Sequence, residues 1–203
     1  MRKIIRGLKK LKANSFTLVE LLVVISIIGM LAGLAVPAIS KGLEKGKQTV
    51  DVSNGKGLGT LLFAYASDQA LGDGSFPTNG ATSTEIFQFL VTNNFLTTVK
   101  ILGGGNIKAP TATNMITSSN VAWAYTTGLT LSEGNTPLLS TKFSLTSVEN
   151  TNKVAPNSQS PWKEKGFVVV TADASAAWYT FTNGFVTPKW LPCTNTGVSV
   201  LQP

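Results

Sequence analysis

The sequence contains no histidine and only one cysteine, Cys193. Histidine is the most frequent general base near neutral pH and the most frequent zinc ligand, so its absence argues against triad hydrolysis and a structural zinc site. A single cysteine cannot form an intrachain disulfide, and such a residue most often behaves as a small buried apolar side chain. No nucleophile motif is present either, so the composition argues against an enzyme.

Acidic residues are also few, because 10 Asp and Glu face 17 Lys and Arg and give a formal net charge of +7. Such a balance can indicate a nucleic-acid partner. However, residues 1–15 contain six of the basic residues and no acidic one, so that 11 basic and 10 acidic residues remain in the rest of the chain. The excess positive charge is therefore a topology signal, and the sequence predicts no nucleic-acid partner.

Charge is missing altogether from one long apolar run. No side chain between Leu21 and Ile39 is charged. At about 1.5 Å per residue, roughly 20 helical residues cover the ~30 Å hydrocarbon core of a bilayer. The basic segment before the run favours a cytoplasmic N-terminus. We therefore predict a basic leader over 1–15, one membrane-spanning helix over 16–39, and a remainder on the outer side of the membrane.

One acidic residue interrupts the apolar pattern near its start. Glu20 would cost on the order of 2.5 kcal/mol or more inside a bilayer unless it is interfacial, neutralised or paired. The junction between polar and apolar residues, Asn14-Ser15-Phe16, lies before the run and is followed by Thr17-Leu18-Val19-Glu20. A secretory signal would instead be cleaved after its apolar region. A simple anchor or signal peptide does not account for this arrangement.

A basic leader, a small residue, Phe-Thr-Leu-x-Glu-Leu and a long apolar helix resemble the type IV pilin and type II secretion pseudopilin family. The resemblance implies that a prepilin peptidase cleaves between Ser15 and Phe16 and methylates the new amine of Phe16. The family usually has glycine where this chain has Ser15, which implies slower cleavage. The resemblance also assigns Glu20 to assembly register, and Gly29 and Pro37 to helix loosening in the filament. Alternatively, these two residue types are simply frequent in membrane helices.

The helix is predicted to continue as an amphipathic segment over residues 40–71, because Leu58, Leu62 and Tyr65 recur at helical spacing. Glycines within this segment each cost roughly 1 kcal/mol relative to alanine, so the helix depends on packing. Residues 72–78 end it, since Gly, Asp and Pro cannot extend a helix there. This Asp-Gly-x-Phe-Pro-Thr run is similar to a loop of major pseudopilins and favours a secretion role.

Residues 72–203 are predicted to form an extracytoplasmic α+β head. A capping-box pattern, Thr82–Glu85, predicts a short helix over about 84–96. A triple glycine at 103–105 is not followed by Gly-Lys-Ser/Thr and predicts a break, not a phosphate loop. Strands are predicted at Val121–Thr126, Phe167–Thr171 and Trp178–Thr182, the last two antiparallel. The predicted fold is thus α+β and pilin-like, with a long N-terminal helix packed on an antiparallel sheet.

A second loop, around Pro161-Trp162, is relevant to whether the head binds calcium. Pro161-Trp162 faintly resembles the Asp-Pro-Trp-Gly loop of major pseudopilins, but Ser160 replaces Asp and Lys163 replaces Gly. Heads of this family often bind calcium through loop carboxylates, whereas only two acidic side chains follow Glu149 in this chain. Calcium takes about six or more oxygen ligands. The sequence therefore predicts no bound calcium and no other cofactor.

The resemblance implies a structural subunit and not an enzyme. The favoured function is a pseudopilin of a type II secretion system, anchored in the inner membrane and then assembled into a periplasmic filament. Its implied partners are the prepilin peptidase, other pseudopilin subunits in homo- or heteropolymers, and the inner-membrane assembly platform. One alternative is a type IV pilin for adhesion, motility or DNA uptake. Another, from a different class, is a membrane-tethered periplasmic enzyme or binding protein.

Overall fold

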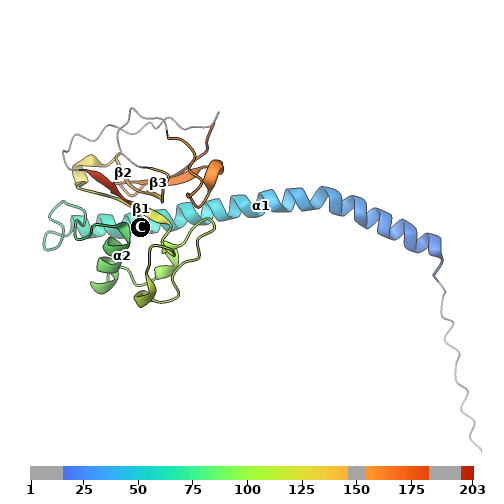
Figure 1. The fold of residues 1–203 in the computed structure, drawn as a ribbon, viewed down its shortest axis with the longest axis horizontal. Coiled ribbons are helices and arrows are strands. Elements are labelled where there is room, and N and C mark those ends of the chain that lie inside the picture. The colour runs from blue at the N-terminus through green and yellow to red at the C-terminus, as the bar shows by residue number, and fades with distance from the viewer. Residues whose placement is uncertain (1–15, 146–153, 183–197) are drawn as a thin grey trace, which may run out of the picture. The chain divides into compact units, whose positions relative to one another are not determined.

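A computed structural model describes residues 16–145, 154–182 and 198–203. The chain divides into two compact units, Met1–Glu44 and Lys45–Pro203. Helix α1 (Leu18–Ser67) supplies the helical residues of the first unit and the first element of the second (Figure 1). The predicted leader, with Ser15, and the single cysteine Cys193 lie outside the described residues, so the predictions about them remain predictions.

The described part of the first unit is an apolar helix that exposes its large side chains. Phe16, Met30 and Leu34 are each 74% exposed. Among the described residues, α1 is the one helix whose length and composition would allow it to cross a membrane, and its most apolar stretch has no buried residue. A helix that is apolar on all sides requires lipid or other helices around it.

In its described residues, the second unit contains a five-stranded antiparallel sheet and a short helix, α2 (Ser83–Thr92). The strands follow the order β4-β3-β2-β1-β5 across the sheet. Their bounds are β1 (Trp123–Thr127), β2 (Pro137–Thr141), β3 (Phe167–Thr171), β4 (Ala176–Tyr179) and β5 (Ser199–Leu201). A long N-terminal helix and an antiparallel sheet form the predicted α+β, pilin-like architecture.

Several boundaries differ from those predicted. Helix α1 ends at Ser67 and not at 71, and α2 ends at Thr92 and not at 96. The predicted range of β3 is confirmed, and β4 pairs with it antiparallel as expected but starts two residues earlier. The sequence pattern predicts neither β2 nor β5. All five side chains of β2 are buried, so this strand lacks the alternation that identifies a half-buried strand.

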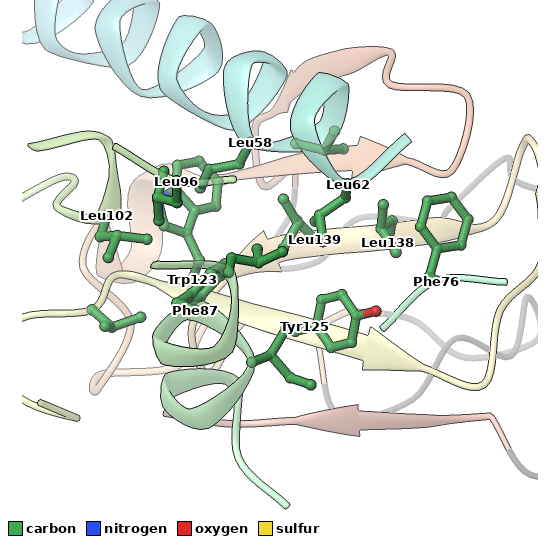
Figure 2. Close-up of a cluster of buried hydrophobic side chains, with 14 of the residues drawn as sticks. Leu58, Leu62, Phe76, Phe87, Leu96, Leu102, Trp123, Tyr125, Leu138 and Leu139 are labelled. Atoms are coloured by element: carbon green, nitrogen blue, oxygen red, sulfur yellow. The ribbon is translucent and has the colours of Figure 1, made fainter. Parts of the chain in front are cut away.

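The main core lies between α1, α2 and one face of the sheet. Leu58 and Leu62 of α1 are fully buried and face the sheet, where Trp123, Tyr125 and Leu139 lie (Figure 2). Strand β3 contributes alternate residues to two clusters. Val168 and Val170 belong to the main core, and Phe167 and Val169 join a smaller cluster that includes Tyr179 and Phe181. Side chains of a strand alternate between faces, so β3 is buried on both.

Two glycines determine how closely α1 approaches the sheet. A Cβ at Gly55 would lie 2.8 Å from the Trp123 ring, and one at Gly59 would lie 2.6 Å from Cγ1 of Val170. Both glycines lie on the packed face of α1, one helical turn apart. A Cβ at the neighbouring Gly57 would meet no other atom within 4 Å. The close contact between the helix and the sheet therefore offsets the low helical propensity of Gly55 and Gly59.

We predict opposite effects of alanine at Gly57 and Gly59. Gly57→Ala should raise the free energy of unfolding by about 0.5–1 kcal/mol, because alanine is the better helix former. Gly59→Ala should lower it by about 1 kcal/mol, because overpacking against the stiff Val170 side chain costs about 1–3 kcal/mol and exceeds the propensity gain. Urea unfolding of the detergent-solubilised chain, followed by tryptophan fluorescence, measures both. Equal stabilisation by the two substitutions would contradict the close-contact argument.

Candidate functional site

The segment expected to be processed begins at Phe16, immediately outside α1. Thr17 caps the helix, because the Glu20 backbone N–H donates to Thr17 Oγ1 at 3.2 Å. The Glu20 carboxylate reaches back and accepts from the Thr17 backbone N–H and hydroxyl, each at 2.8 Å. This reciprocal pair is a capping box. It sets the start of α1 one residue beyond Thr17 and leaves exposed Phe16 outside the helix.

The capping box gives Glu20 a local role that the sequence analysis missed. The signal was available, because Thr17-x-x-Glu20 is the same pattern that correctly predicted the start of α2 at Thr82-x-x-Glu85. A simple apolar anchor can therefore use a glutamate at this position to satisfy its first backbone N–H groups. Capping and a contact with a neighbouring subunit are separate roles, and the first needs no partner chain.

The two positions expected to loosen the helix lie in an unbroken part of α1. Pro37 lies inside the helix and, lacking an N–H, cannot donate to the Gly33 carbonyl one turn earlier. Ser40 donates its hydroxyl to the Val36 carbonyl at 3.0 Å beside this point. A Cβ at Gly29 would meet no other atom within 4 Å. The helix thus has a missing backbone bond and an uncrowded glycine, and loosening on assembly stays a prediction.

The loop over residues 72–78 is an integral part of the second unit. Phe76 is 1% exposed and its N–H donates to the Leu129 carbonyl at 3.1 Å. The buried Tyr125 hydroxyl donates to the Pro77 carbonyl at 2.7 Å, and burial raises the pKa of Tyr125. Figure 2 shows Phe76 and Tyr125 in the same core. The Phe-Pro pair of this loop therefore has a packing role beyond turn formation.

A buried carboxylate of α1 connects two loops that the sequence analysis treated separately. Asp51 is 5% exposed, and its Oδ2 accepts the indole N–H of Trp162 at 2.7 Å and the backbone N–H of Gly105 at 2.6 Å. The Trp162 ring also packs edge-on against Trp178, with centroids 5.1 Å apart. Burial raises the pKa of Asp51, although both hydrogen bonds act in the opposite direction. Sequence reasoning missed this contact because its partners are 54 and 111 residues away.

The Trp162 loop contains a left-handed residue directly after the tryptophan. Lys163 has a φ of 52°, in the left-handed region that glycine adopts most easily. Ser160, at the position of the family's aspartate, is 4% exposed and its hydroxyl hydrogen-bonds that of Ser144 at 3.0 Å. The loop therefore combines a left-handed residue at Lys163 with a buried, neutral side chain at Ser160. Within the described ranges, no group of three or more His, Cys, Asp and Glu could hold a metal ion.

We predict that Asp51 matters as a hydrogen-bond acceptor more than as a charge. Asp51→Ala should lower the free energy of unfolding by about 2 kcal/mol, because it leaves two buried donors unpaired. Asp51→Asn keeps one oxygen able to accept both bonds and should be tolerated. A carboxyl group with a raised pKa in the folded state destabilises the fold when ionised. The wild type should therefore gain stability relative to Asp51→Asn as the pH falls from 7 towards 4.

Urea unfolding of both variants at several pH values measures these effects. A difference between wild type and Asp51→Asn that is constant over this range would show that the carboxylate titrates alike in the folded and unfolded chains.

Comparison with known proteins supports the N-terminal assignment. Residues 10–36 match the family model of the prokaryotic N-terminal methylation motif. No curated protein and no solved structure matches the chain significantly. The matched range contains the predicted cleavage position, the Thr17–Glu20 capping box and Gly29. A prepilin-type motif at the start of an exposed apolar helix, followed by an α+β head, supports a type IV pilin-like structural subunit that a prepilin peptidase processes and that assembles with similar subunits.

Proposed function

We propose that this protein is a pseudopilin, a structural filament subunit of a type II secretion system. The observation that carries the proposal is the methylation motif at 10–36 on a helix whose large apolar side chains are exposed. Such a helix can be stored in the inner membrane and later packed among copies of itself in a filament core. In this arrangement the second unit lies in the periplasm, and the partners are prepilin peptidase, other subunits and the assembly platform.

Two loops favour secretion over the other pilin-like functions. The Asp-Gly-x-Phe-Pro-Thr loop, similar to that of major pseudopilins, buries Phe76 and binds Tyr125 through the Pro77 carbonyl. The loop that contains Trp162 places Lys163 in the backbone conformation expected of the family's glycine. Both features concern the head, whereas the methylation motif is common to pilins and pseudopilins. We also propose that the head folds without calcium, because Ser160 is neutral and Asp51 is bound by two N–H donors.

The first test concerns processing and export. Mass spectrometry of the membrane-extracted protein should find a chain that starts at methylated Phe16. Deletion of the gene should trap exported proteins in the periplasm while surface pili persist. Loss of surface pili with normal export would favour a type IV pilin, and a mature chain that retains Met1 would favour a tethered protein of another class.

A second test separates the two roles of Glu20. If the carboxylate pairs with the Phe16 amine of a neighbouring subunit, it offsets a desolvation cost of several kcal/mol per ion in the filament core. Glu20→Gln can retain the capping box, since glutamine serves at this position, but loses the charge. It should therefore abolish efficient assembly while cleavage after Ser15 continues. Glu20→Leu should do the same and improve membrane retention.

The matched control for this test is Thr17→Val, which removes the capping hydroxyl and leaves the carboxylate. Filament yield from sheared cells and the mass of the mature N-terminus measure both outcomes. Thr17→Val should assemble nearly as well as wild type. If Thr17→Val abolishes filaments and Glu20→Gln does not, capping is the role of Glu20 and the pairing proposal is wrong.

A further inference from the structure

Among the described residues of the second unit, most exposed charged side chains lie at one of two separate ends. At the end of α1, three loops are joined by backbone hydrogen bonds, in which Leu131 donates to Gly74 and Asp173 donates to Gly134, each at 2.9 Å. These loops, residues 68–75, 128–136 and 171–175, contain four acidic residues and no lysine or arginine. The four are Asp68, Asp73, Glu133 and Asp173. We call this set the acidic end.

Two side chains of the acidic end accept hydrogen bonds from neutral groups. Asp68 accepts the Ala70 N–H at 2.8 Å. Desolvation acts to raise the pKa of the Asp173 carboxyl group, but the hydrogen bonds from Thr171 and Ser175 together outweigh it and hold that pKa below the ordinary value. Asp68, Asp73 and Asp173 are all exposed. Three of the four carboxylates of the acidic end are therefore accessible to a partner.

The opposite end of the unit is basic. The buried Asp51 contact brings the loop at Gly105 and the loop at Trp162 together at the start of the packed part of α1. These three elements carry five exposed lysines and one exposed acidic residue, Glu164. The lysines are Lys45, Lys47, Lys108, Lys163 and Lys165. We call this set the basic end. Lys56, Glu85, Lys100 and Lys142 belong to neither end.

The two ends are too far apart to neutralise each other within one molecule. Asp51 marks the basic end on α1, and Ala66, whose carbonyl accepts the Gly74 N–H at 2.9 Å, marks the acidic end. Fifteen residues of α-helix between them correspond to about 22 Å along the axis. The Debye length at physiological ionic strength is about 8 Å, so attraction across the unit is largely screened. Each end is available to an external partner of opposite charge.

We propose that the basic end of one copy of this chain docks on the acidic end of another, so that the heads stack in one direction. This inference rests on the proposed filament function and adds to it the surface through which heads meet. The partner is a second copy because the chain itself carries both complementary surfaces. A head-to-tail contact of this kind leaves one unused surface at each end of the assembly, and it extends into a filament unless its rotation closes a ring. In the reversed orientation two ends of like charge would meet, and their repulsion disfavours that arrangement.

The test uses charge reversal at each end and at both ends of the full chain. Lys47→Glu with Lys163→Glu should lower filament yield roughly tenfold, because each exposed ion pair changes an equilibrium constant about two- to fivefold. Asp68→Lys with Asp73→Lys should lower it equally. The chain with all four changes should recover most of the yield, since the ends are again opposite. Asp68→Asn with Asp73→Asn, which keeps the turn residues compatible with their backbone, should lower yield less than the lysine pair.

A second measurement needs no variant. A zero-length carbodiimide crosslinker joins only amines and carboxylates that are in contact, and the separation of about 22 Å prevents such a link between the two ends of one copy. In membranes containing a mixture of ¹⁴N- and ¹⁵N-labelled wild-type chains, peptides with Lys47 or Lys163 should be joined to peptides with Asp73 or Asp173 of the other isotope. Their absence overturns the proposal.

Two other outcomes also overturn it. Failure of the four-change chain to recover, when both pairs reduce yield, shows that net charge or folding is responsible. Reduction by the Lys pair alone, with the Asp pair unaffected, indicates that the basic end meets anionic lipid headgroups. The crosslinking result is independent of export, so labelled crosslinks in a strain whose export is normal support head stacking while contradicting the secretion role.

Discussion

The close contact between α1 and the sheet is the constraint on which the second unit depends. Gly55 and Gly59 present no side chain, so Val170 and the Trp123 ring occupy the space that two Cβ atoms would need. This approach buries Leu58 and Leu62 and aligns Asp51 with the loops at Gly105 and Trp162. A helix with ordinary residues at both glycines would have to move away, and the buried acceptor on the same helix would lose its two donors. Packing and polar contacts are thus coupled along one helix face.

Helix α1 has two different environments along its length. Up to Ile39 its large side chains are exposed and apolar, which suits lipid or neighbouring helices. Beyond Lys45 one face is buried against the sheet, and the other is exposed and carries Lys47 and Lys56. The side chains of Thr17 and Glu20 accept hydrogen bonds from backbone N–H groups at the start of the helix. The apolar segment therefore does not depend on another chain to cap its first turn. Subunit contacts can then be made without the loss of local structure.

Short sequence patterns correctly identified the elements that are determined by interactions between nearby residues. The capping pattern Thr82–Glu85 correctly placed the start of α2, and the run of valines in β3 gave its range. Strand β2 was missed because the sheet and loops bury all of its residues, which removes the period-two pattern. Strand β5, with three residues, is too short to show a pattern. For Glu20 the sequence analysis did not identify its partner within the same chain, the neighbouring Thr17.

The sequence by itself determined the membrane-competent helix, the processing motif and the α+β class, because these depend on composition and on spacing over a few residues. Tertiary structure alone decided the strand order, the meaning of the glycines and the partners of Asp51. A glycine costs helix stability in any local account, and only the position of Val170 shows why Gly59 is better than alanine. The contacts of Asp51 join residues that are 54 and 111 positions apart. Such contacts produce no periodic pattern in the sequence, because only the folding of the whole chain brings these residues together.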